Sequence, residues 1–442
     1  MLARYLDGVD RAVAATPPTR NRVVDAWRVI ALGFVVLGHW LSASIWVQSD
    51  GSILAGNTLE WFPAAEHLTW IFQVMPIFFL AGGYANAAAL DHTTGGARVW
   101  TTTRFRRLFT PAVPVVVVWT ILAVVLGPVV PANVLHAGVL SATLPLWFIA
   151  VYLIMVMLAP ITFRWWRARR WPSVMLLAGA AIVVDIVRFG AGIEWIGWVN
   201  YLFVWAAVHQ VGFAWFDRET SGHMPPRRVG LGLIAVGMGM LVMTTAVDFY
   251  PTSMVTIPGG GISNMTPPTF ANGFLAIAQL GVIVALLPQA RRFAAKRLVW
   301  RVVVGVSGAM MTIYLWHLTS LSLLGAAGIF LGDGWLFSFE PGTTLWWWLR
   351  PPFIAVLAAI TVLLVSVFLV FERRIRRVDH APGTPVWVLG MVGCIAGSGA
   401  MALTGLVDTE ARINWWIPTV VIGAAALTGA WPELRSRSPV PD

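Results

Sequence analysis

An arginine and a histidine, Arg28 and His39, stand out inside the first long apolar stretch of the chain, residues 22–47. Arg28 and His39 are eleven positions apart, which in an α-helix puts them on nearly the same face with about 16 Å of rise between them. If Arg28 marks one surface of a bilayer whose hydrocarbon core is about 30 Å thick, His39 lies close to the midplane. An ionisable group at that depth usually serves a transport pathway or a chemical step. The alternative is a neutral imidazole that hydrogen-bonds to a neighbouring helix, with Arg28 as an ordinary anchor.

Four further side chains could do chemistry or bind a ligand. Arg104 and Arg107 are three apart, so on a helix they form a two-pronged cation site suited to phosphate oxygens, or equally to lipid headgroups. Arg106 faces elsewhere and is interpreted as an orientation signal. Glu372 stands beside four arginines, where a local salt bridge is the default interpretation. His317, in a later apolar run and about 24 Å of rise from Arg301, is predicted to lie nearer the outer face than His39.

The elements that position these residues are apolar helices. The chain has 442 residues, of which 58% are hydrophobic and only 11% charged, against about 25% charged in soluble domains. We therefore predict an all-α polytopic membrane protein of about twelve transmembrane helices. The predicted runs are 23–47, 66–90, 108–130, 143–163, 172–190, 194–216, 229–249, 269–289, 302–331, 347–371, 385–406 and 413–431.

The basic residues predict the orientation of these helices. With both termini in the cytoplasm, all but three of the 30 Lys and Arg residues fall in cytoplasmic segments; the exceptions are Arg188, Arg350 and Arg412. Such asymmetry is typical of a protein that obeys the positive-inside rule. Among the outer segments, residues 250–268 are polar and rich in glycine and proline, which predicts a lid, an acceptor-binding loop or a plain flexible connection.

Several short motifs, in this order along the chain, resemble the membrane-bound acyltransferase-3 family. They are arginine, ten residues and histidine in RVIALGFVVLGH (28–39), MPIFFLAGGY (75–84), RFRR (104–107), PLWFIAVYL (145–153), YLWH (314–317) and FERRIRR (371–377). One departure is visible, because glycine stands at position 82 where the family pattern has serine. The resemblance implies a ten-helix membrane domain over residues 23–377. Residues 1–22 would then be a cytoplasmic segment, and residues 378–442 two additional helices with a short cytoplasmic tail.

The resemblance also implies a function. An integral-membrane O-acyltransferase would take an acyl group, expected to be acetyl, from cytoplasmic acyl-CoA and transfer it to a hydroxyl of a carbohydrate or glycolipid of the cell envelope, in the inner or plasma membrane. His39 would act with Arg28 as general base or transient acyl carrier. Arg104, Arg107 and Glu372 would serve the donor. His317 and Trp147 are candidates for the acceptor side, although a structural histidine and a packing tryptophan are the alternatives.

Other function classes are less well supported by the sequence. A twelve-helix proton-coupled transporter with His39 as a relay is the main alternative, but the two halves of the chain show no convincing similarity. A lipid-binding scaffold would not need a histidine at the midplane. The net charge of +10 comes from short clusters between apolar runs, which predicts contacts with membrane lipids rather than nucleic acid. The sequence contains no metal-site spacing, and Cys394 is its single cysteine.

Overall fold

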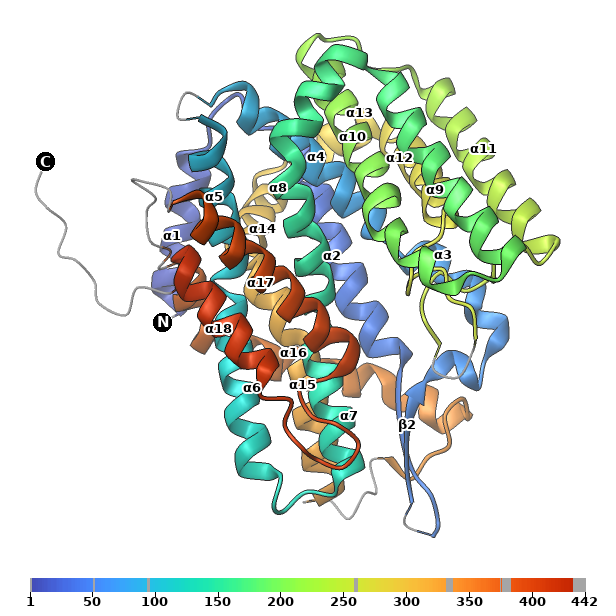
Figure 1. Ribbon diagram of the computed structural model, residues 1–442, viewed down its shortest axis with the longest axis vertical. Helices are drawn as coiled ribbons and strands as arrows, with labels where there is room; N and C mark the ends of the chain where they lie inside the picture. Colours follow the sequence, from blue (N-terminus) through green and yellow to red (C-terminus); the bar gives the residue numbers. More distant parts are fainter. Residues whose placement is uncertain are drawn as a thin grey trace, which may run out of the picture. The chain divides into compact units, whose positions relative to one another are not determined.

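The structure, a computed structural model, describes residues 2–50, 52–93, 96–257, 261–330, 337–373, 375 and 383–431 (Figure 1). Each of the twelve predicted apolar runs overlaps a helix. The main helices are α2 (Arg22–Ser42), α4 (Met75–Asp91), α6 (Ala112–Leu126), α8 (Leu146–Arg169), α9 (Trp171–Ala191), α10 (Asn200–Thr220), α11 (Arg227–Ala246), α12 (Ala271–Ala285), α15 (Met310–Phe330), α16 (Thr344–Arg373), α17 (Thr384–Thr404) and α18 (Trp416–Thr428).

Shorter elements lie between and before these helices. They are α1 (Leu2–Ala14), α3 (Thr69–Phe72), α5 (Gly96–Phe109), α7 (Ala132–Thr143), α13 (Leu287–Ala295), α14 (Arg297–Ser307), three 3₁₀ helices (Thr58–Glu60, Pro63–Leu68 and Glu194–Val199) and two antiparallel strands, β1 (Ala43–Val47) and β2 (Ile53–Asn57). The helical membrane class is thus confirmed, with one small hairpin that the sequence did not predict.

Among the described residues, fewer than the predicted twelve helices meet a length-and-composition criterion for crossing a membrane. Within the described residues, nine helical segments are long and apolar enough to cross a membrane, or ten if α12 and α13, which meet at 62°, form one broken span. Helix α18 has only 13 residues, and α10 is not among the nine. A multi-pass membrane protein is therefore established, whereas the count of twelve is not confirmed.

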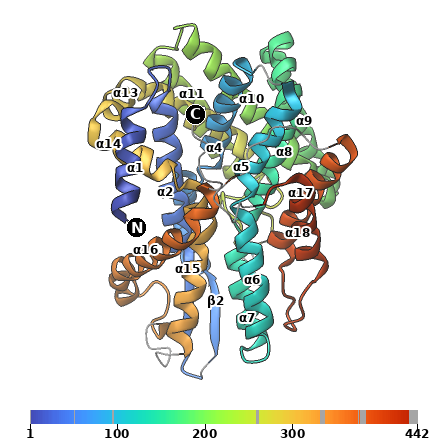
Figure 2. The same ribbon diagram turned by 90° about the vertical axis from the view of Figure 1, so that its left-hand side faces the viewer.

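The chain folds as two compact units. Unit 1 comprises Met1–Ala43, Gly56–His92 and Leu158–Gly308. Its α4 and α10 cross so closely that a Cβ on Gly212 would lie 2.8 Å from the Cα of Gly83, and beside this crossing Phe79 stacks on Trp205 at 4.4 Å between ring centroids. At another part of the same unit, α1 and α2 lie beside α13 and α14 (Figure 2). Trp300 is the centre of that contact and is 1% exposed.

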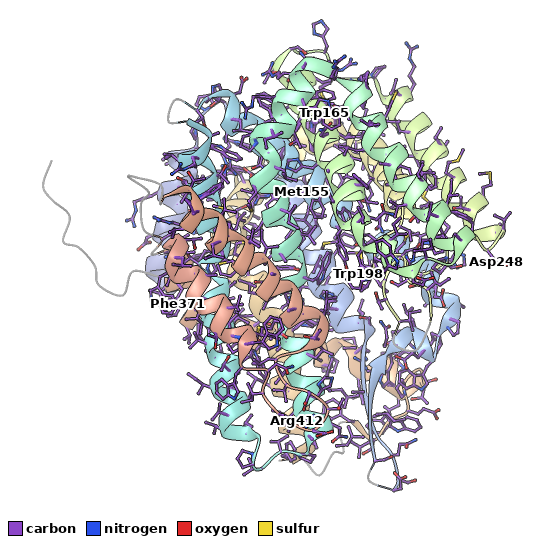
Figure 3. All side chains as sticks on the ribbon, in the orientation of Figure 1. Met155, Trp165, Trp198, Asp248, Phe371 and Arg412 are labelled. Atoms are coloured by element: carbon purple, nitrogen blue, oxygen red, sulfur yellow. The ribbon has the colours of Figure 1, made fainter. Side chains whose placement is uncertain are left out.

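Unit 2 comprises Ser44–Ala55, Thr93–Met157 and Ala309–Asp442. Helix α15 packs against α7 and α16, and Trp316 of α15 stacks on Phe368 of α16 at 3.7 Å. Helices α17 and α18 form an antiparallel pair, drawn in red in Figure 1, and Figure 3 places Arg412 at the loop that joins them. There Arg412 donates a hydrogen bond to Asp408, which lowers the pKa of that carboxyl group.

Several helices are shorter than their predicted apolar runs, and in three of these the helix ends or breaks at identifiable residues. Helix α2 ends at Ser42, and the residues after it, including the strand formers Ile45, Trp46 and Val47, form β1 instead. The run 66–90 is broken at Gln73 and Val74, after which α4 begins at Met75 with Pro76 in its first turn. The run 302–331 is broken at Gly308, so the helix that carries His317 begins only at Met310.

The segment 250–268 is hydrogen-bonded into unit 1 over its described residues, so a plain flexible connection was the wrong alternative for these. Asn264, which is 0% exposed, donates from its side chain to the carbonyl groups of Pro251 and Ser253 and accepts a bond from Thr269. Tyr250 donates to Asp185 of α9 at 2.7 Å. Residues 258–260 lie outside the described part of the chain. A run of short polar residues has no periodic pattern, so this network of hydrogen bonds could not be predicted from the sequence.

Candidate active site

Arg28 and His39 lie on α2, as predicted, in unit 1. Asn21 caps this helix by accepting bonds from the backbone N–H groups of Val23 and Val24. The Asn21 side chain also donates to the hydroxyl of Tyr84 at 3.1 Å, which fixes the start of α2 against α4. The cap therefore positions the face that carries both candidate residues.

Asp25 is a neighbour of Arg28 that sequence reasoning missed. It is 8% exposed, lies 3.6 Å from the guanidinium of Arg28 and accepts a 2.7 Å hydrogen bond from Arg20. An acidic residue in the first turn is favourable because the helix N-terminus carries partial positive charge. The spacing of three between Asp25 and Arg28 was the available signal. Arg28 is thus held at the start of α2, with about a third of its side chain exposed.

His39 lies in the last turn of α2. Its backbone carbonyl accepts hydrogen bonds from the side chain of Ser42 and the backbone N–H of Ala43, which end the helix. His39 therefore lies nearer the end of its helix than the continuous run 23–47 predicted. The rise of about 16 Å from Arg28 is retained, because both residues lie within the regular helix. The partly buried imidazole lies four residues before β1 begins.

Arg104 and Arg107 lie on α5 in unit 2, three residues apart as predicted. The guanidinium of Arg104 lies over the ring of Trp100 at 5.5 Å, and Arg107 is exposed. A cation on an aromatic face keeps its N–H donors directed sideways, where they can bind an anion. The pair can therefore bind phosphate oxygens.

Arg106, between these two residues, has a different place from the one predicted. It is 7% exposed, and its Nε donates a 2.8 Å hydrogen bond to the carbonyl oxygen of Thr428 at the end of α18. A surface orientation signal does not describe this buried contact. No local pattern could have indicated it, because the two residues are 322 positions apart.

Glu372 binds the first turn of α15, the helix of unit 2 that also carries His317. The Glu372 carboxylate accepts bonds from the backbone N–H groups of Met311 and Thr312 and from the Thr312 hydroxyl, at 3.2, 2.9 and 2.5 Å. It thereby satisfies N–H groups that a helix start leaves open, and places negative charge at the positive end of the helix. Of the remaining FERRIRR motif, Arg374, Arg376 and Arg377 lie outside the described residues.

His317 is 0% exposed and is the eighth residue of α15. Because α14 ends at Ser307 and α15 begins at Met310, the rise of about 24 Å counted from Arg301 along one continuous helix does not apply. The Nδ1 of His317 lies 2.6 Å from the carbonyl oxygen of Tyr314. A carbonyl only accepts, so Nδ1 carries the hydrogen and, in the neutral ring, Nε2 is the basic nitrogen.

Trp147 belongs to an aromatic group that reaches this histidine through Tyr314. It is partly buried and contacts Phe148 at 6.1 Å, and Phe148 packs edge-on against Tyr314 at 5.3 Å. The hydroxyl of Tyr314 donates to the carbonyl of Pro145. The PLWF and YLWH motifs are therefore in contact with each other, as parts of one aromatic wall in unit 2.

These features define a polytopic membrane protein whose helices carry arginine and histidine side chains. One of these histidines, His317, contacts an aromatic group and lies on a helix whose first turn is bound by Glu372. Residues 21–371 match the family described as acyltransferase domain, acyltransferase-3. The chain belongs to this family, and its class is therefore that of a membrane acyltransferase. No curated protein and no solved structure matches it. The match ends before α17 and α18.

Proposed function

We propose that the protein is an O-acyltransferase that takes an acyl group, acetyl first of all, from acyl-CoA at the cytoplasmic side of the inner or plasma membrane. The acceptor is a hydroxyl of a carbohydrate or glycolipid of the cell envelope at the opposite side. The observation that carries the proposal is the family match over residues 21–371, which includes every residue assigned a role below except Glu372, one position beyond it. The match supports acyl transfer and not the transporter alternative.

The proposed donor site is the basic pair on α5. Arg104 and Arg107 bind the phosphates of CoA, because two guanidinium groups three residues apart on a helix span adjacent phosphate oxygens. Glu372, which binds the first turn of α15, is the third residue proposed to serve the donor. The donor's phosphates would thus remain in water while the thin pantetheine arm carries the thioester inward.

The proposed catalytic group is His39. As general base, its imidazole takes the proton of the acceptor hydroxyl while the oxygen attacks the thioester carbonyl. The C–S bond then breaks, and the CoA thiolate takes the proton back from the imidazolium. In the other route, a neutral ring nitrogen of His39 attacks the thioester carbonyl, and the C–S bond breaks to release the CoA thiolate. The acyl group is held on that nitrogen until the acceptor oxygen attacks it; the acyl–nitrogen bond then breaks, and the hydroxyl proton passes to the thiolate. Arg28 supplies positive charge at the start of the same helix.

The proposed topology has both termini in the cytoplasm and counts α10, α12 and α18 as membrane segments. All but three of the Lys and Arg residues then face the cytoplasm. Asp408, Glu410 and segment 250–268 then lie on the outer side.

Acetyl-CoA consumption tests this function. The purified full-length chain in detergent is incubated with acetyl-CoA and with envelope glycan or glycolipid extracts, and the released CoA thiol is measured together with acetyl incorporation into the extract. We expect CoA release that depends on the extract and matches the acetyl incorporated. The absence of both, with a folded protein and with longer acyl-CoA donors as well, would contradict the proposal.

A further inference from the structure

Helix α5 has two faces with different surroundings. Arg98, Thr102 and Arg106 follow one another at intervals of four, so they form one stripe along the helix. Trp100, Arg104 and Arg107, at intervals of four and three, form another. Arg104 and Arg106 are two positions apart and so point about 200° from one another around the helix axis. The first stripe is therefore directed away from the pair proposed to bind the donor.

Each residue of the first stripe binds the C-terminal pair of helices. Arg98 donates to the hydroxyl of Thr384 at 2.8 Å. The indole N–H of Trp387 donates to the hydroxyl of Thr102 at 2.7 Å. These two contacts hold the beginning of α17 against α5. At the other end of this pair, the His136 ring on α7 donates from Nδ1 to the carbonyl of Val407 at 2.7 Å.

Arg106 makes the third contact, at the C-terminus of α18. Gly429 follows that helix with φ of 65°, and the N–H groups of Gly429 and Ala430 bond to Ala426 and Ala425, which is a Schellman motif. The carbonyl of Thr428 remains at the negative end of the helix dipole, and the guanidinium of Arg106 binds it. A Cβ on Gly429 would lie 2.6 Å from Nη2 of Arg106, so glycine is required both for the turn and for the approach of this cation.

We propose that Arg106 is a positioning residue for acyl transfer. By binding the end of α18 it fixes the rotation of α5 about its own axis, and thereby the direction in which Arg104 and Arg107 face the phosphates of the acyl-CoA donor. A helix that slipped by one residue would turn the pair by about 100°. The inference rests on the proposed donor role of that pair, and it gives a function to two helices that lie beyond the family match.

The test separates donor recognition from the chemical step. Arg106→Met removes the bond to Thr428 with a side chain of similar length, and Gly429→Ala disturbs the same bond from the partner's side. We expect both variants to raise the KM for acetyl-CoA about tenfold with kcat nearly unchanged. Arg106→Lys keeps a cationic donor and should restore most of the affinity. The control is Gly423→Ala on α18, where a Cβ would meet no atom within 4 Å and the KM should not change.

A mutant cycle distinguishes this inference from the proposal on which it rests. Arg104→Ala combined with Arg107→Ala should raise the KM by itself, and adding Arg106→Met should then have no further effect, because Arg106 acts only through that pair. A raised KM in the double variant with an unchanged KM in Arg106→Met would overturn the positioning role alone. An unchanged KM in the double variant would overturn the donor site and the positioning role together. A lower melting temperature of Arg106→Met with a wild-type KM in the folded fraction would show a purely structural contact.

Discussion

Gly83 and Gly212 meet backbone to backbone where α4 crosses α10. A Cβ on Gly83 would lie 3.0 Å from the Cα of Gly212 and would also overlap the carbonyl oxygen of His209. The second glycine of FFLAGG is therefore explained by packing, since a side chain at that position would force two membrane helices apart. Small residues allow this close approach in a solvent where apolar burial between helices contributes little.

Gly83→Ala should destabilise unit 1 by about 3 kcal/mol or more, because the inserted methyl group meets backbone that cannot rotate away. Thermal unfolding in detergent, followed by tryptophan fluorescence, measures the effect. Gly239→Ala on α11 is the matched control, since its Cβ would meet no atom within 4 Å, and it should leave stability equal or slightly higher. Equal melting temperatures for the two variants would refute the tight crossing.

Tyr250→Phe should lower stability by about 1.5–3 kcal/mol, because the buried Asp185 carboxylate loses one of three donors. The other two, Asn200 and the backbone N–H of Phe270, each lie 2.7 Å from it. Burial and the charge of Asp185 raise the pKa of Tyr250, so the phenol stays a donor at neutral pH.

Tyr201→Phe is the comparison for Tyr250→Phe. The Tyr201 hydroxyl donates to the Met265 carbonyl at the longer distance of 3.3 Å, and its loss should cost about 0.5–1 kcal/mol. Chemical denaturation of both variants gives the two values. The reverse order would contradict the assignment of Asp185 as the residue that anchors segment 250–268.

His39→Gln should retain the fold and lose at least about 100-fold in acyl transfer, the lower limit for loss of a general base. Glutamine replaces a hydrogen bond but neither accepts a proton near pH 7 nor carries an acyl group. Acetyl incorporation is measured per folded protein. His223→Gln, in an exposed turn, should keep wild-type activity. A folded His39→Gln enzyme with more than about a tenth of the activity would rule out this catalytic role.

His317→Asn examines the second histidine by keeping the hydrogen bond of Nδ1 while removing Nε2. The amide nitrogen of asparagine can donate to the Tyr314 carbonyl as the imidazole does. If Nε2 contacts the acceptor, we expect a higher KM for the acceptor, an unchanged KM for acetyl-CoA and a normal melting temperature. A loss of stability without a change in KM would instead assign His317 to packing.

Cysteine labelling checks the proposed orientation. A cysteine at Glu410 should react with a membrane-impermeant thiol reagent in intact cells, and one at Arg169 should react only after the cells are opened. Both side chains are exposed, whereas Cys394 is 0% exposed and gives little background. Labelling at position 169 in intact cells, with none at 410, would invert the topology.

The sequence predicted the positions of the helices well because apolar runs are a direct consequence of the bilayer. It predicted the ends of the helices less well. The run 23–47 is apolar throughout, yet helix changes to strand after Ser42, because apolar composition alone does not distinguish a buried strand from a helix. The breaks just before Pro76 and at Gly308 had local signals, but weak ones within continuous hydrophobicity.

In the candidate site, too, local features could be predicted from the sequence, whereas long-range contacts could not. The spacing of Arg28 and His39 survives because both lie in one regular helix. The partner of Glu372 was not predictable, because its bonds to Met311 and Thr312 join residues about sixty positions apart. Asn264 was not recognised for a similar reason. Its side chain binds the backbone carbonyl groups of Pro251 and Ser253, and the residue type alone does not indicate these partners.

The contact between Arg106 and α18 shows that the end of the family match and the end of the packed unit 2 lie at different places in the chain. The family match ends at residue 371, but the contacts that hold unit 2 together extend to α17 and α18. A chain shortened to the recognised part would leave a buried guanidinium without its acceptor and would remove the groups that bind Arg98 and Thr102, a large penalty for a buried cation. We therefore expect that α17 and α18 cannot be deleted from this chain without destabilising unit 2.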